Sequence, residues 1–242
     1  MRVTSTSYAD NLIAQLQAQS SRQSTLQQQI ASGQRIQTAD QDPLAMQQVL
    51  ALRDNSASMT QFSENIKTHQ EFATVSGNVL KSLTKILDRA QEIAVRADGT
   101  ASPKDLQSYG TEVGQLIRQA IDLANTQHRG EYILAGTKSG SAPFTSTTDA
   151  DGKITAVNYS GAGSTSESEI APGVLVSSRM VGENSSGSGE RGLFADSRFG
   201  ANLFGHLIAL KNQLDSGDVT TIAQTTRADL QKDEDNVLYH VG

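Results

Sequence analysis

The chain has 242 residues, a formal net charge of −6 at pH 7, and neither cysteine nor tryptophan. The negative charge argues against a general nucleic-acid binder, because phosphates attract basic proteins. The absence of cysteine excludes disulfides and thiolate metal sites. Only 5% of the residues are aromatic, so few large side chains are present to fill one thick core. This composition favours long helices that pack along narrow apolar seams.

No secretory or membrane-spanning segment is visible in the sequence. The amino terminus, MRVTSTSYADNLIAQLQAQ, lacks the continuous apolar region of a cleavable signal peptide. No apolar run approaches the length that spans a bilayer. We therefore expect no membrane partner, and any export would need a route other than general secretion.

The first predicted helix is a weak coiled-coil segment. Its apolar positions follow a seven-residue rhythm and are Leu12, Leu16, Leu26 and Ile30. Glutamines stand at positions 19 and 23, where that rhythm expects apolar side chains. Alone, such a segment is marginal. It is either a solvated, poorly formed helix or an interaction helix that orders when a partner binds.

A polar turn follows this helix. Gly33 is the residue type that ends helices in a left-handed conformation, and Asp42 followed by Pro43 predicts a capped start of the next helix. Arg35, Asp40 and Asp42 are spaced as if the turn were a contact surface. The two acids also resemble a carboxylate pair for acid–base chemistry, but no nucleophile or base accompanies them in the sequence, so we favour a capping role.

The clearest periodicity predicts a helix from about Pro43 to Arg96. Apolar or small residues follow alternating three- and four-residue steps at Met59, Phe62, Ile66, His69, Ala73, Ser76, Leu80, Leu83, Leu87, Ala90, Ala94 and Ala97. A second column consists of Phe72, Val79, Ile86 and Ile93. Two adjacent columns are typical of a helix that packs against two neighbours in a bundle.

A second helix is predicted to fold back on the first. Ser102 and Pro103 are a cap and a first-turn proline, and the heptad rhythm then continues until His128. A short loop between two long helices makes an antiparallel hairpin. We expect its core to be formed by Phe62, Ile66, Leu80, Leu83, Leu87, Leu106, Val113 and Leu116.

The composition of the sequence changes at Glu131, where glycine, serine and threonine become more frequent and the helical period is lost. DADGK, at 149–153, superficially resembles a calcium loop but lacks the other ligands, so it predicts a turn before a strand at Ile154–Tyr159. Helical periodicity returns with Leu203. The predicted fold is therefore mainly α, a long antiparallel helical bundle with a small β-rich insertion. Its segments are 1–42, 43–130, 131–195 and 196–242.

No pattern of catalytic or metal-binding residues is present. The four histidines lack a second ligand at helical spacing, and the metalloprotease, nucleotide-binding and serine-hydrolase motifs are missing. We therefore expect no enzyme activity, no cofactor and no metal site.

Two stretches resemble a known family. LQQQIASGQRIQTADQDPLAMQQVLALR is similar to the amino-terminal signature of the flagellin superfamily, and GEYILAGTKSGSAPF resembles its narrower group of hook–filament junction proteins. The resemblance implies an extracellular structural protein of the bacterial flagellum, exported unfolded through the type III apparatus with a chaperone. It also implies self-assembly into a junction ring, next to another hook-associated junction protein and to flagellin. The alternatives are a short filament flagellin and, less favoured, an enzyme carried in the insertion.

The resemblance also assigns the amino-terminal segments. Residues 1–30 would join an inner coiled-coil layer, and the Gly33–Pro43 turn would link two concentric layers. Leu12, Leu16, Leu26, Ile30, Arg35, Asp40 and Asp42 would lie at subunit interfaces. Family members continue past DNVLYHVG with a further apolar helix, whereas this sequence stops at Gly242. We therefore expect roughly the first 30 residues to be disordered in the free chain, because a lone weak heptad helix is marginal in water, and the chain to polymerise poorly.

Overall fold

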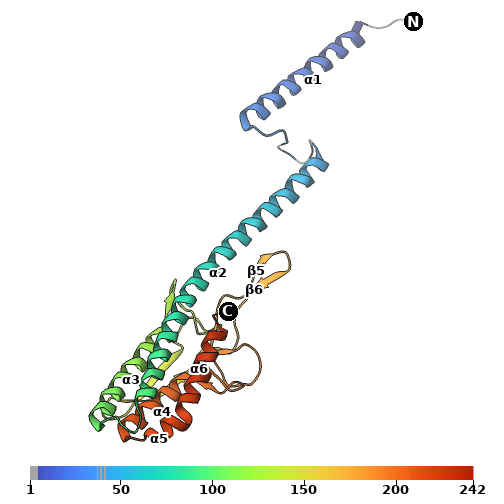
Figure 1. The fold of residues 1–242 in the computed structure, drawn as a ribbon. Coiled ribbons are helices and arrows are strands. Elements are labelled where there is room, and N and C mark those ends of the chain that lie inside the picture. Colours follow the sequence, from blue (N-terminus) through green and yellow to red (C-terminus); the bar gives the residue numbers. More distant parts are fainter. Residues whose placement is uncertain (1–4, 37, 39, 41, 242) are drawn as a thin grey trace. The chain divides into compact units, whose positions relative to one another are not determined.

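The computed structural model describes residues 5–36, 38, 40 and 42–241. In this part the chain is mainly helical, and a segment of short strands is inserted between the helices (Figure 1). The predicted fold class is therefore confirmed. Contacts group the chain into two compact units, residues 1–61 and residues 62–242. The division between these units lies inside the long helix α2 (Pro43–Arg96).

The first unit holds helix α1 (Ser5–Ser32) and the start of helix α2 (Pro43–Arg96). Gly33 ends α1 with a φ of 67°, and its N–H donates to the Gln29 carbonyl at 2.9 Å. Asp42 caps α2, since its Oδ1 accepts the Ala45 N–H at 3.0 Å. The predicted stop and restart are thus local capping features, made by the residue types that favour them.

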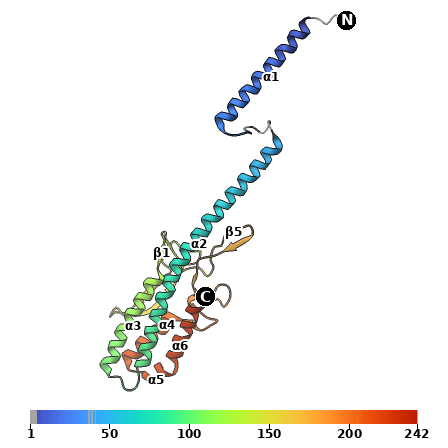
Figure 2. The same ribbon diagram turned by 45° about the horizontal axis from the view of Figure 1, so that its top comes forward.

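The second unit is a helical bundle with strands against it. Helix α3 (Pro103–Ala124) folds back along α2, and Ser102 and Asp105 form the reciprocal capping box at its start. Helices α4 (Leu203–Ser216), α5 (Val219–Thr221) and α6 (Arg227–Tyr239), with the π-turn Ile222–Thr226 between the last two, complete the bundle. Helix α4 contacts both α3 and α6, as Figures 1 and 2 show.

The core of this unit is a seam along α2 and α3. Its buried members include Leu80, Leu83, Leu87, Leu106, Val113 and Leu116. Phe62 and Ile66 differ from the prediction: Phe62 is half-buried and Ile66 is 39% exposed. A heptad pattern shows that one helix face is apolar, but burial needs a second element to cover it. In this unit the full burial of α2 side chains begins at Phe72.

The end of α2 is held by a side chain from the other end of the sequence. Arg227, at the start of α6, donates from Nε and Nη2 to the Ala94 carbonyl at 2.9 and 2.8 Å. Its Nη2 also donates to the Val95 carbonyl at 3.1 Å. A cation is well placed there, because the last carbonyls of a helix carry partial negative charge.

The strands form small sheets. Three antiparallel hairpins join β1 (Gln127–His128) to β2 (Glu131–Tyr132), β3 (Phe144–Thr148) to β4 (Ile154–Tyr159), and β5 (Ser168–Ala171) to β6 (Val174–Val176). A last sheet has β7 (Val181–Asn184) parallel to β8 (Gly192–Asp196), which is antiparallel to β9 (Ala201–Asn202). The DADGK segment is a hairpin turn as predicted, since the Oδ1 of Asp149 accepts the Lys153 N–H at 2.8 Å.

The few aromatic residues gather where strands meet helices. Phe144 on β3 lies with its ring centroid 4.9 Å from that of Phe194 on β8, and Phe194 stacks on Phe204 of α4 at 5.0 Å. Tyr159 on β4 adds a fourth ring, 5.0 Å from Phe144. Aromatic pairs contribute large buried areas per residue, so this cluster fastens the β-rich segment to the bundle.

Candidate functional site

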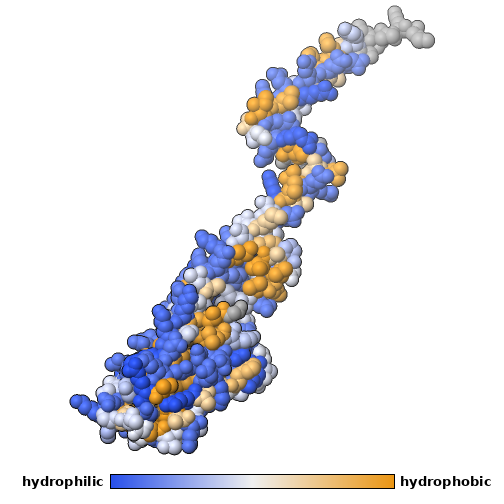
Figure 3. Space-filling view, in the orientation of Figure 1, coloured by the Kyte–Doolittle hydropathy of each residue, from blue (hydrophilic) through white to orange (hydrophobic). Residues whose placement is uncertain are grey.

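Helix α1 presents apolar side chains to solvent. Leu12, Leu16, Leu26 and Ile30 are 49%, 58%, 57% and 82% exposed, and their spacing puts them on one helix face. Figure 3 shows hydrophobic surface along this helix. Tyr8 and Ile13 are also exposed there, and the seven-residue search passed over both. An exposed apolar face of this kind is typical of a surface that another element covers.

The turn between α1 and α2 carries the predicted charged residues. The Nη2 of Arg35 lies 3.5 Å from Oδ2 of Asp42, with side chains 72% and 38% exposed. A hydrogen bond from the Thr38 side chain lowers the pKa of Asp40. Arg35 and Asp42 are thus brought together across the turn. Both remain accessible, so their pairing adds little stability by itself.

The first half of α2 also exposes apolar side chains. The sequence pattern placed Met59 in the packed seam of this helix, and it did not predict an exposed surface at Leu44, Leu50 and Leu52. Leu44, Leu50, Leu52 and Met59 are all at least half exposed. The sequence feature that could have indicated this surface is the seven-residue step from Leu52 to Met59, because it extends the heptad pattern towards the amino terminus. A groove of about 380 Å³ lies here, and Ile36, Val49, Leu52 and Arg53 are among its lining residues.

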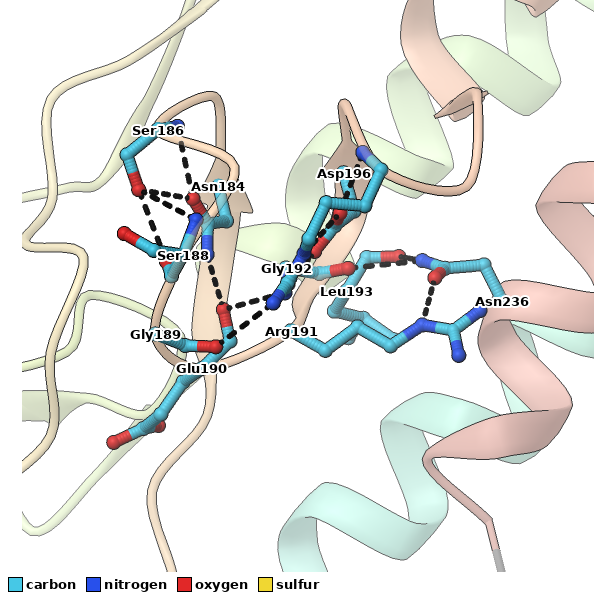
Figure 4. Close-up of polar contacts among 11 residues, drawn as sticks. Asn184, Ser186, Ser188, Gly189, Glu190, Arg191, Gly192, Leu193, Asp196 and Asn236 are labelled. Carbon is cyan, nitrogen blue, oxygen red and sulfur yellow. Dashed lines mark hydrogen bonds and ion pairs between the residues drawn. The ribbon is translucent and has the colours of Figure 1, made fainter.

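The second unit contains a polar network between the segment 184–198 and helix α6 (Figure 4). Asn184 donates from Nδ2 to the Ser188 carbonyl at 2.7 Å and to the Glu190 carbonyl. Its Oδ1 accepts the Ser186 N–H at 2.9 Å. This asparagine is 4% exposed, so its side chain shapes the loop from inside.

Asn236 of α6 joins that loop to the bundle. Its Nδ2 donates to the carbonyls of Gly192 and Leu193 at 2.9 and 2.7 Å, and its Oδ1 accepts from Nε of Arg191 at 2.7 Å (Figure 4). The Arg191 guanidinium lies 3.7 Å from the ring centroid of Phe199 and 4.1 Å from that of Tyr239. Cation–π contacts with these two rings hold this arginine in place.

Asp196 is the charged centre of the network. Its side chain is fully buried and lies 2.7 Å from Nη2 of Arg198, and its Oδ2 accepts the Gly192 N–H at 3.1 Å. The hydrogen bond from Arg198 outweighs burial and lowers the pKa of Asp196 to about 2. The carboxylate is thus used to bind this arginine and the backbone of β8.

The contacts of this polar network hold the segment 184–198 against helix α6. They do not form an arrangement suited to catalysis. In the described part of the chain, no group of three or more His, Asp or Glu side chains is arranged to hold a metal ion. Helices with the length and hydropathy of a membrane span are likewise not found among the described residues. The exposed apolar side chains of α1 and of the first half of α2 favour a role in protein–protein contact.

Comparison with known proteins identifies the family. The profile of the bacterial flagellin N-terminal helical region matches residues 3–139, more than half of the chain. The chain belongs to the flagellin family. Among curated relatives, flagellar hook-associated protein 3 of Escherichia coli (strain K12) is 32% identical to this flagellin-family chain over 119 residues. The protein of the same name from Salmonella typhimurium (strain LT2) is 32% identical over 121 residues. These matches cover 48% and 49% of the chain but only 38% of each relative.

Solved structures share the fold of this flagellin-family chain. A protein assigned as a flagellar hook-associated protein from Vibrio parahaemolyticus has a TM-score of 0.69 at 20% identity, covering 84% of this chain and 86% of that one. FlgL of Bacillus cereus has a TM-score of 0.61 at 20% identity, covering 81% and 87%. At these identities the likeness establishes the fold alone. The resemblance seen in the sequence is confirmed at the level of the family.

Proposed function

We propose that this flagellin-family chain is a structural subunit of the bacterial flagellum and forms the junction ring between hook and filament. Family membership and the likeness to proteins named flagellar hook-associated protein 3 support this proposal. The structural observation that carries it is the apolar surface on α1 and the first half of α2, where large aliphatic side chains are exposed.

Assembly would proceed by packing these helices between subunits. Leu12, Leu16, Leu26 and Ile30 would be buried in a coiled-coil seam, and each fully buried leucine or isoleucine contributes roughly 1.5–3 kcal/mol relative to exposure. Phe62 and Ile66, which the second unit leaves partly exposed, would also be covered by neighbours. The polar turn with Arg35, Asp40 and Asp42 would make charged contacts at the subunit boundary and fix the register.

The proposed partners and location follow from this role. The ring would adjoin another hook-associated junction protein on one side and flagellin on the other. The chain would act outside the cell, after export through the flagellar apparatus with a chaperone. Its function would be mechanical, so no enzyme activity is proposed.

A filament flagellin is the second candidate, because the matching family profile is that of bacterial flagellin. Immunogold electron microscopy of intact flagella, with antibody against the insertion 131–192, separates the two. We expect a single band of label where hook meets filament, absent from cells that lack the gene. Label along the whole filament would assign the chain as a flagellin. Flagella without label would contradict both candidates.

A further inference from the structure

The β5–β6 hairpin carries an apolar tip outside the packed body. Val174 and Leu175 are 47% and 60% exposed, and Figure 3 shows hydrophobic surface over this hairpin. An isolated two-stranded hairpin is marginal in water, and an exposed apolar tip adds no stability to it. The hairpin therefore resembles an element that is stabilised by binding to another surface.

The hairpin is nevertheless held in a defined position. Asn65 of α2 donates from Nδ2 to the Glu169 carbonyl at 2.7 Å, and Nε2 of His69 lies 2.7 Å from Oγ of Ser168. At the turn, Oε1 of Glu169 accepts the Gly173 N–H at 2.7 Å. These bonds fasten the base to α2 and order the turn, so the tip is preorganised for contact.

An apolar groove lies elsewhere on the same unit, between α2 and α3. Its volume is about 510 Å³ and its apolar lining consists of Ile86, Leu116 and Leu123. Lys85 and Asp122 also line it. Among the described residues, no ion pair or hydrogen bond of the Lys85 side chain is found. The groove is roomy enough for two aliphatic side chains and offers an unpaired cation beside them.

The tip and the groove lie at different levels of α2. The hairpin bonds to Asn65 and His69, whereas Lys85 and Ile86 line the groove, about 25 Å further along the helix. Figures 1 and 2 both show the β5–β6 hairpin on the side of α2 away from α3. The tip and the groove therefore cannot meet within one chain, but the tip of one copy can enter the groove of the next. Such a head-to-tail contact is heterologous, and heterologous contacts of suitable rotation close into rings. Glu169 beside the tip matches Lys85 of the groove in charge.

We propose that the β5–β6 hairpin of one subunit docks into the α2–α3 groove of a second copy of this chain, with Val174 and Leu175 in the groove and Glu169 against Lys85. The proposal rests on the ring assembly of the proposed function and names the surface through which adjacent subunits meet. It needs no partner of another kind.

Disulfide trapping tests the contact directly, because the chain contains no cysteine. Leu175→Cys and Gln119→Cys would be placed in one chain, produced as the only copy in cells, and oxidised on isolated flagella. We expect multimers that disappear on reduction. The matched control pairs Leu175→Cys with Ser108→Cys, on the same face of α3 but about 16 Å further along the helix, beyond disulfide reach. We expect at least tenfold less multimer from the control.

Charge reversal provides a second arm. Lys85→Glu, in the cysteine background, should lower the multimer yield severalfold. Glu167→Lys, which reverses a nearby acid outside the hairpin strands, should leave the yield unchanged. Unaltered melting curves of the purified variants would show that folding is intact.

The outcomes distinguish this contact from the general role. Suppose that the antibody labels the junction but the Leu175–Gln119 pair gives no multimers, or no more than the control pair gives. That result would overturn the hairpin contact and leave the junction role standing. No label on flagella would overturn the junction role and this contact together.

Discussion

The stability of the protein at low pH depends on the ion pair between the buried Asp196 and Arg198. The pKa of Asp196, lowered to about 2 by Arg198, lies below its unfolded value of 3.8. The stabilisation is therefore fully present above the unfolded value and is lost as the pH falls towards about 2. We expect Asp196→Asn to lower the free energy of unfolding at pH 7 by about 2 kcal/mol and to flatten its dependence on pH between 2 and 4. Urea unfolding at a series of pH values measures both.

The control is Asp151→Asn in the exposed β3–β4 turn, where the carboxylate has no described ion-pair partner. It should change stability by less than about 0.5 kcal/mol. An equal loss of stability in both variants would mean that net charge, and not the Arg198 contact, determines how stability falls at low pH.

His206 and Asp233 predict the opposite trend at higher pH. Nδ1 of His206 lies 2.7 Å from Oδ2 of the fully buried Asp233. Burial lowers the pKa of His206, but the hydrogen bond and charge of Asp233 outweigh it and raise that pKa above 6.5. Burial raises the pKa of Asp233, which His206 offsets only in part. Both shifts mean that the folded chain holds protons more tightly than the unfolded chain.

The stabilisation from His206 is therefore present below pH 6.5 and is lost as the pH rises through the folded pKa. We expect His206→Gln to lower stability at pH 6 by about 2 kcal/mol, the scale of a charge-assisted hydrogen bond, and to remove most of the slope between pH 6 and 9. Guanidinium unfolding across this range checks it. A slope that survives the substitution would assign the titration to other groups.

At the scale of elements, the contact between α3 and α4 depends on small residues. A Cβ at Gly110 would lie 2.6 Å from Oδ1 of Asp215 and 3.6 Å from Cβ of Leu214, and one at Gly114 would lie 3.3 Å from Cε of Lys211. The missing side chains let the Lys211–Asp215 ion pair, 2.8 Å long, lie against α3. Glycine at position 110 therefore lets the Asp215 carboxylate stay in this place, and a larger side chain there would displace it.

Gly110→Leu should destabilise the protein by about 2 kcal/mol, because overpacking forces the helices apart. Gly77→Leu is the matched control in α2, where nothing lies within 4 Å of an added Cβ. There, replacing a mid-helix glycine should stabilise by about 0.5–1 kcal/mol. Thermal melting of both variants compares them, and shifts of the same sign would show that helix propensity dominates over packing at Gly110.

For the whole molecule, replacing leucine by aspartate should have different consequences in the two units: loss of folding in one and loss of assembly in the other. Leu83 is 0% exposed and Leu16 is 58% exposed. Leu83→Asp should unfold the second unit, because a buried unpaired charge costs several kcal/mol. Leu16→Asp should leave unfolding of the monomer unchanged within about 0.5 kcal/mol and should abolish assembly.

Denaturant unfolding and electron microscopy of flagella measure the two effects. Arg35→Ala gives a polar counterpart, since its exposed side chain should matter for assembly and not for monomer folding. If Leu16→Asp lowered the unfolding midpoint as strongly as Leu83→Asp, then α1 would belong to the folded core of the monomer and the interface role would fail.

The sequence alone predicted the helix boundaries that local chemistry controls. Gly33, the Asp42–Pro43 pair and Ser102 act on backbone groups within a few residues, so their effect can be seen without tertiary information. The heptad seam from Leu80 to Leu116 was also predictable, since its period states which face is apolar. The partial exposure of Phe62 and Ile66 was not predictable, because it depends on whether another element covers that stretch of helix.

The sequence by itself therefore determined a mainly helical flagellin-family chain with a β-rich insertion, because periodicity and capping are properties of neighbouring residues. The fold alone established that Asn236 bonds Arg191, 45 positions away, that Arg227 caps the end of α2, and that β7 pairs in parallel with β8. These pairings join residues or strands that no local pattern connects. Each buried polar group needs a partner, and which one it finds depends on how the helices and strands pack.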